Sequence, residues 1–164
     1  MTQYQNPIYY KGPRLELVTV RAKDSLTWQA GQFARRTDSG LVLCKSNASS
    51  IQYVTAETQA TSTSTSDVPV WKIPSAETQF IMGVTSGGVD TRALASYIGS
   101  NEGLAVNSCI CTLSTGNDST EVLHVEDILA NKTNGYRGID TSDLPGYLIV
   151  SVVQSALQAE GAGL

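Results

Sequence analysis

The residues best suited to catalysis are few in this chain of 164 residues. His124 is the only histidine, which restricts catalytic triads, imidazole acid–base chemistry and histidine-rich metal sites. Glu121, Glu126 and Asp127 lie around it in a segment that we expect to be helical, where these spacings spread the carboxylates instead of converging them. His124 is therefore interpreted as a structural residue.

Three cysteines offer a second kind of chemistry. Cys109 and Cys111 are two residues apart on an expected strand, so they point to the same face but are poorly placed to bridge each other. A soft-metal site would need further ligands, and only Cys44 and His124 remain. An odd number of cysteines without a secretion signal predicts free, reduced, structural thiols and no metal site.

The sequence lacks the common motifs of cofactor binding and nucleophilic catalysis. The glycine-rich stretch 83–88 has no Gly-Lys-Ser/Thr ending and is interpreted as a turn, not a phosphate-binding loop. No Gly-x-Ser-x-Gly elbow occurs despite 18 serines. The sequence thus favours a protein that is not an enzyme and uses no cofactor.

The charges are distributed unevenly along the chain. The net charge is −4 and the pI about 4.9, which argues against nucleic-acid binding because phosphate neutralisation needs a basic face. Residues 1–45 hold seven bases and three acids (+4), whereas residues 46–164 hold four bases and twelve acids (−8). Chance scatter explains such a split equally well. The functional alternative is that Arg14, Arg35 and Arg36 face acidic groups of a partner.

The first fourteen residues are predicted to form an extended arm, because Pro7 and Pro13 interrupt any helix or interior strand. The aromatic side chains of the arm either fold back over the protein's own core or contact a neighbouring subunit. The candidate contact residues of the arm are Tyr4, Tyr9 and Tyr10.

Composition and patterning predict a mainly β fold, a compact antiparallel barrel or sandwich. Serines and threonines together number 35 against 26 charged residues, which favours strands and turns over surface helices. Residues 15–164 are expected to form a single β-rich domain, with a possible C-terminal elaboration at 102–164. No apolar stretch is long enough to span a membrane and no signal peptide precedes the arm, so the chain is expected to stay in the cytoplasm where it is made.

Alternation of apolar residues predicts strands at 15–22, 32–36, 41–44, 51–55, 68–73, 80–84, 104–106, 108–113 and 147–153. Asp38-Ser39-Gly40 is expected to close a hairpin. Pro69 predicts an edge strand, and the two-sided apolar strand at 147–153 is expected to be central or covered by another chain. Only 119–130 has helical spacing, through Val122, Val125 and Leu129.

Four aromatic residues admit two readings. Trp28, Tyr53, Trp71 and Tyr97 either fill the core of a β domain or form a platform for stacking sugars. Core filling is the more common role. A carbohydrate-binding module therefore stays an alternative function.

Two segments resemble the head decoration, or capsid cement, proteins of tailed bacteriophages. They are Leu26–Thr58 and Asp67–Val84, and they carry the resemblance through the order of their parts. Ala30-Gly31 enters a strand, the Gly40 hairpin follows, Tyr53 lies on the next strand, and a hydrophilic loop precedes the Val-x-x-Ile-Pro and Thr-x-Phe patterns of 70–80. The segment Glu102–Leu164 goes beyond the matched region.

The resemblance implies a structural virion protein that binds the outer surface of an expanded phage head, commonly as a homotrimer. Its partner would be the major capsid protein, whose subunits it would bridge and stabilise. The resemblance implies no catalytic residues. Another virion part, such as a tail, neck or fibre protein, is the principal alternative.

Overall fold

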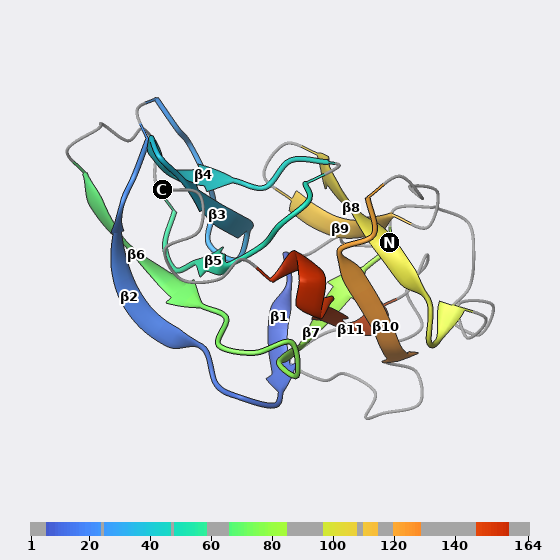
Figure 1. Ribbon diagram of the computed structural model, residues 1–164. Helices are drawn as coiled ribbons and strands as arrows, with labels where there is room; N and C mark the ends of the chain where they lie inside the picture. The colour runs from blue at the N-terminus through green and yellow to red at the C-terminus, as the bar shows by residue number, and fades with distance from the viewer. Residues whose placement is uncertain are drawn as a thin grey trace.

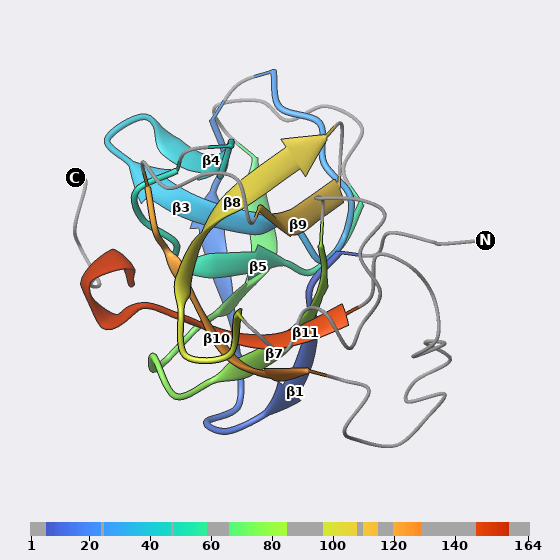
Figure 2. The ribbon, with the colours of Figure 1, turned by 90° about the vertical axis from the view of Figure 1, so that its right-hand side faces the viewer.

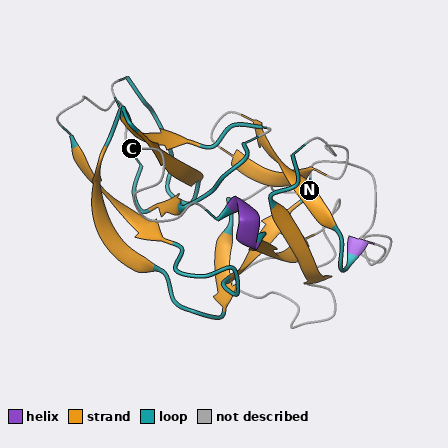
Figure 3. Ribbon diagram, viewed as in Figure 1, coloured by secondary structure: helices purple, strands orange, loops and turns teal. Residues whose placement is uncertain are grey.

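A computed structural model describes residues 6–23, 25–46, 48–58, 66–84, 97–107, 110–114, 120–128 and 147–157. In these ranges the chain forms two antiparallel sheets, which confirms the predicted mainly β, sandwich-like fold (Figures 1 and 3). No closed barrel is formed. The strands are β1 (Ile8–Lys11), β2 (Glu16–Arg21), β3 (Phe33–Thr37), β4 (Gly40–Leu43), β5 (Tyr53–Thr55), β6 (Asp67–Lys72), β7 (Gln79–Gly83), β8 (Asn101–Asn107), β9 (Ile110–Ser114), β10 (Leu123–Ile128) and β11 (Tyr147–Val152).

The five-stranded sheet has the order β2-β6-β5-β3-β4. The predicted hairpin is present, with Thr37 opposite Gly40 and the Asp-Ser turn between β3 and β4. The far ends of the sheet curl towards each other, because Ala22 forms a parallel bridge with Leu41 and the Lys23 N–H donates to the Leu41 carbonyl at 3.1 Å. In Figure 1, β2 and β6 run side by side as long curved strands along the outside of this sheet.

The prediction that β6 is an edge strand is wrong, because β6 lies between β2 and β5. Pro69 is tolerated there for two geometric reasons. The ladder between β5 and β6 ends at the Thr55–Val70 pair, so the adjacent Pro69 has no partner in it. On the other side, Ala22 N–H donates to the Ser66 carbonyl, and the alternation of an antiparallel ladder then makes Thr19–Pro69 a pair without hydrogen bonds.

The six-stranded sheet has the order β1-β7-β11-β10-β8-β9. β11 is central in this sheet, as one of the two predicted alternatives, and all six of its residues are buried. One face of β11 packs into the main core through Leu148, Val150 and Val152, and the other packs with Ile81 and the half-buried Tyr10. The idea that this strand forms a subunit contact is therefore wrong, since both faces are covered within the chain.

The predicted helix at 119–130 is wrong, because residues 123–128 form the strand β10. Leu123 and Val125 are buried with strand spacing. Glu126 is then an extra residue in a β-bulge, since Val125 pairs with Val150 while Asp127 pairs with Ile149. The bulge brings Ile128 back to the buried face three residues after Val125, and this interval imitates a helix.

The N-terminal arm is partly a strand. Its residues 8–11 form β1, which pairs with β7 at the edge of the six-stranded sheet. The side-chain amide of Asn6 accepts a hydrogen bond from the Cys111 N–H at 2.7 Å and donates one to the Ala30 carbonyl at 3.3 Å. The arm from Asn6 onwards thus folds back onto its own chain.

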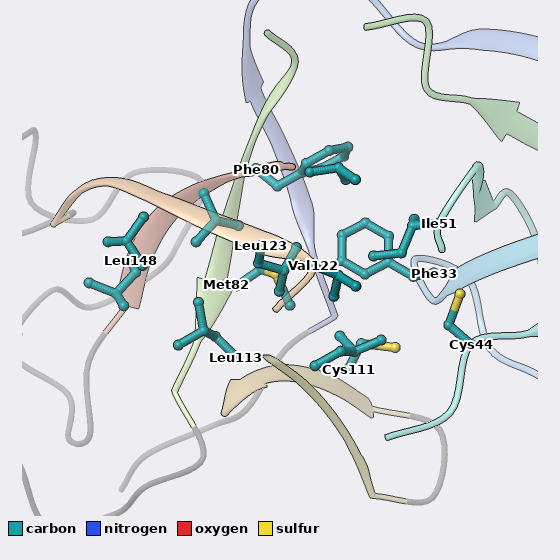
Figure 4. Close-up of a cluster of buried hydrophobic side chains, with 14 of the residues drawn as sticks. Phe33, Cys44, Ile51, Phe80, Met82, Cys111, Leu113, Val122, Leu123 and Leu148 are labelled. Carbon is teal, nitrogen blue, oxygen red and sulfur yellow. The ribbon is translucent and has the colours of Figure 1, made fainter. Parts of the chain in front are cut away.

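The main core lies between the two sheets (Figure 4). Phe33 of the five-stranded sheet is fully buried and meets Phe80 of the six-stranded sheet edge to face, with ring centroids 5.4 Å apart. The two sheets are also joined by backbone and side-chain hydrogen bonds, from Ile51 N–H to the Ala156 carbonyl at 2.9 Å and from Val106 N–H to Ser46 Oγ at 2.8 Å. Ala156 belongs to the short helix η4 (Gln154–Ala156) that follows β11 (Figure 2).

A second cluster fills the concave face of the five-stranded sheet. It contains Trp28, Ala34, Leu41, Tyr53 and Val70 among its buried members. Trp28 and Tyr53 therefore have the core-filling role that was the first reading of the aromatic residues.

Cys44 is a buried free thiol and Cys111 is buried as well; both belong to the main core (Figure 4), and Cys109 lies outside the described residues. Burial raises the pKa of Cys44 far above that of an ordinary thiol; nearby Cys111 adds to the rise and Arg35 opposes it. We expect reductant to leave the melting temperature unchanged. Alkylation of Cys44 at pH 8 should be slow unless the protein unfolds, because the thiolate is the reactive form.

Peptide mapping after iodoacetamide treatment, with and without urea, measures this protection. Rapid labelling of Cys44 in the folded protein, or a drop of the melting temperature in reductant, would contradict the assignment.

Candidate interaction surface

A groove of about 500 Å³ lies between the arm and the five-stranded sheet. Tyr9 and Arg14 line it together with the half-buried Trp71, and apolar side chains form most of its remaining wall. Two of the predicted contact residues therefore share one site. Tyr9 lies on β1, and Arg14 lies on the chain that connects β1 to β2.

Two hydrogen bonds and one backbone conformation hold the arm beside this groove. The Tyr9 hydroxyl donates to the Gly12 carbonyl at 2.6 Å, and Thr78 Oγ1 donates to the Pro13 carbonyl at 2.7 Å. Gly12 itself has φ of +98°, in the left-handed region that favours glycine. The turn after β1 is thus fixed by its backbone conformation and by Thr78, the residue before β7.

An exposed leucine extends the groove along the edge strand β2. Leu17 pairs with Trp71 across β2 and β6, so both side chains lie on the sheet face that packs against the core. Leu17 is nevertheless 58% exposed, because β2 is the outermost strand. Leu17, Trp71 and the apolar groove wall, including Leu15, form a continuous apolar strip, which is the kind of surface that binds other proteins. We call it the β2 strip.

Arg35 and Arg36 do not belong to one site. They are neighbours on β3, so their side chains leave opposite faces of the sheet. Arg35 lines a cavity with Lys23 and Lys45, whereas Arg36 lines a shallow depression with Arg21 and Asp38. Arg21 also forms an exposed ion pair with Asp67 at 3.8 Å, a contact that contributes little stability.

The other two predicted contact residues lie elsewhere. Tyr10 packs on the face of the six-stranded sheet that carries Ile81 and Ile149. Tyr4 lies outside the described residues. Of the six candidate contact residues, two share the groove, one lines the cavity beside β3 and one lines the shallow depression. Tyr10 lies on the other sheet, and Tyr4 is outside the described residues.

The charge split along the sequence becomes a split between the sheets. The strands of the five-stranded sheet carry four bases and two acids, a sum of +2. The strands of the six-stranded sheet carry one base and three acids, a sum of −2. The summed charges of the two sets of strands thus differ in sign, so the five-stranded sheet favours an acidic partner.

Sequence reasoning missed Leu17 and Gln32 as candidates. Leu17 had a usable signal, since it lies on an apolar face of a strand at the start of the predicted sheet, but only strand order shows that this face is uncovered. Gln32 had no usable signal in the sequence, because its complete burial beside basic residues depends on the fold.

The remaining candidates for chemistry are not assembled into a site. No group of three or more possible metal ligands occurs among the residues that the structure describes. His124 Nδ1 lies 2.7 Å from Asn101 Oδ1 on the neighbouring strand. The proposed platform of four aromatic residues is not formed, because Trp28 and Tyr53 are buried in the second cluster while Trp71 borders the groove.

Fold and surface together define a two-sheet antiparallel β protein with an apolar strip and basic side chains on one sheet. No protein family, curated protein or solved structure matches the chain. In the described ranges, no helix is long and apolar enough to cross a membrane.

Proposed function

We propose that the protein is a structural component of a phage virion that binds the outer surface of the capsid and stabilises it by bridging capsid subunits. The β2 strip carries this proposal. An apolar edge strand that remains 58% exposed at Leu17, beside a groove lined by Tyr9 and Trp71, suits burial against another protein.

Two further observations support the proposal. The segments that resemble capsid cement proteins form the adjacent strands β6, β5, β3 and β4 together with β7, so the resemblance follows a contiguous part of the fold. The basic side chains of the same sheet suit an acidic capsid surface. The major capsid protein is the proposed partner, and the virion surface is the proposed location.

The proposed assembly is a homotrimer, formed in solution or on the head. The β2 strip is the candidate subunit or capsid contact, since β11 is fully buried. Burial of a large apolar side chain contributes about 2 kcal/mol before the entropic cost of association, so a few such residues suffice for a modest interface.

Binding to heads that lack the protein tests the function. Purified protein is expected to co-sediment with such heads, to raise their resistance to heat, and to give three-fold density in electron micrographs. The variant Arg35→Glu/Arg36→Glu should bind at least roughly tenfold more weakly and show an altered salt dependence, because it reverses two of the four basic charges on the strands of the five-stranded sheet and so weakens the attraction of that sheet to an acidic surface.

A matched control is Lys11→Glu/Lys132→Glu, which changes the net charge equally but leaves all four bases on the strands of the five-stranded sheet intact. This variant should bind more tightly than the β3 variant. Absence of binding to heads by the unmodified protein would overturn the proposed function, and equal binding by both variants would overturn the role of the β3 arginines.

A further inference from the structure

The cavity beside β3 and β4 gathers basic side chains that the main fold does not require. Its volume is about 590 Å³, and Lys23, Arg35 and Lys45 line it. None of its described lining residues is an aspartate or glutamate. The three bases come from the chain after β2, from β3 and from the chain after β4, so folding brings together charges that are 10 to 22 residues apart.

Two of these bases have no counter-ion among the residues that the structure describes. No ion pair is formed by Arg35 or Lys45 within the ranges that the structure covers, whereas the exposed Arg21 on the same sheet pairs with Asp67. Arg35 is half-buried, which limits its access to water. Its charge thus favours an anion in the cavity.

A buried amide donor lies in the same wall. Gln32 is fully buried and lines the cavity. Its Oε1 accepts a hydrogen bond from the Gln29 N–H at 2.8 Å, but its Nε2 has no hydrogen-bond partner in the described part of the chain. A buried donor without an acceptor is costly, and an acceptor oxygen in the cavity would remove that cost.

The rest of the cavity is apolar and hydroxyl-bearing. Leu26, Val42 and Val106 contribute apolar surface, while Ser46 Oγ is already engaged with the backbone of Val106. A carboxylate on a short apolar stem matches both parts, because its oxygens can meet the bases and the Gln32 amide while its methylene groups contact the apolar wall.

We propose that this cavity binds the carboxylate of a glutamate or aspartate presented by an acidic segment of a partner protein. The proposal rests on the proposed function only for the identity of that partner. The cavity thereby serves as a specific anchor that is distinct from the β2 strip. It holds one carboxylate side chain of the partner in a fixed position.

Isothermal titration with hexaglutamate tests the site without a capsid. We expect saturable binding to the full chain that weakens with salt, and no binding of hexaglutamine. Arg35→Gln/Lys45→Gln should weaken binding at least roughly tenfold, because each lost charge-assisted hydrogen bond is worth about a factor of ten or more. Gln32→Met should also weaken it, with no loss of positive charge.

The matched control is Lys11→Gln/Arg14→Gln, which removes the same charge from residues that do not line the cavity. Equal weakening by this control would show attraction by net charge alone and overturn the site. So would unchanged binding by Arg35→Gln/Lys45→Gln, which replaces one half-buried and one exposed base by polar side chains and should fold normally.

Further measurements distinguish a carboxylate from a phosphate as the bound anion, and the cavity proposal from the proposed capsid function. Tight binding of inorganic phosphate, with hexaglutamate bound no better than hexaglutamine, would overturn the carboxylate assignment. If Arg35→Gln/Lys45→Gln loses hexaglutamate but binds heads unchanged, the anchor role is overturned while the capsid function stands. If hexaglutamate binds as expected and heads do not, the cavity stands and the capsid function fails.

Discussion

Replacing Phe33 by alanine is expected to destabilise the protein by about 3–5 kcal/mol. Phe33 is fully buried and is the aromatic side chain that crosses from the five-stranded sheet to Phe80 of the six-stranded sheet. The substitution removes the edge-to-face pair and leaves a cavity between the sheets, where neither sheet can close without moving its whole ladder. Thermal and urea unfolding monitored by circular dichroism measure the loss.

Leu17→Ala is the matched control for this change. Leu17 lies on β2 of the same sheet, on the face that packs against the core, but it is 58% exposed. Its truncation should therefore change the free energy of unfolding by less than about 1 kcal/mol. The proposed function gives Leu17→Ala a different effect, namely weaker binding to heads. A loss of stability at Leu17 as large as at Phe33 would contradict the arrangement of the two sheets.

Gly12→Ala is expected to cost at least about 2 kcal/mol and to loosen the arm. Gly12 has φ of +98°, and a Cβ there would meet the Glu77 carbonyl oxygen and lie 3.2 Å from Thr78 Cα. Both contacts are backbone, so the turn and not a side chain must move. Hydrogen exchange should therefore accelerate at the amides of β1 as well as at the turn.

Gly99→Ala separates the two causes of this effect. Gly99 has a similar φ of +89°, but a Cβ there meets no atom within 4 Å. It should show only the cost of the left-handed conformation, about 1–2 kcal/mol, and leave exchange of β1 unchanged. Equal effects of the two substitutions on β1 would mean that the arm is not held by its close approach to the backbone of Glu77 and Thr78.

The strand pattern of the sequence identified most elements, because alternation of buried and exposed residues is a local property. It failed at β10, where the bulge at Glu126 changes the spacing of buried residues from two to three. It failed again at β6, where Pro69 is placed beyond the end of the β5 ladder. Both errors arise from the partner strand, because its length and register cannot be inferred from the sequence of the segment itself.

The candidate site was predictable only in part. The basic character of the early strands follows from the sequence, and so does the aromatic arm. That Arg35 and Arg36 leave opposite faces follows from strand periodicity, yet which of them meets Lys23 and Lys45 depends on the curl that joins Ala22 to Leu41. The exposure of Leu17 and the unpaired amide of Gln32 depend likewise on the order of the strands.

The position of β11 has a consequence for the order of events during synthesis. The strands of the five-stranded sheet lie together between residues 16 and 72, so that sheet can pair as soon as this stretch has left the ribosome. The six-stranded sheet cannot, because β7 waits for β11, a partner more than 60 residues later in the chain. During that interval Phe80, Ile81 and Met82 have no strand on one side. A nascent chain of this protein therefore passes through a half-folded stage in which an apolar strand edge needs protection from other chains.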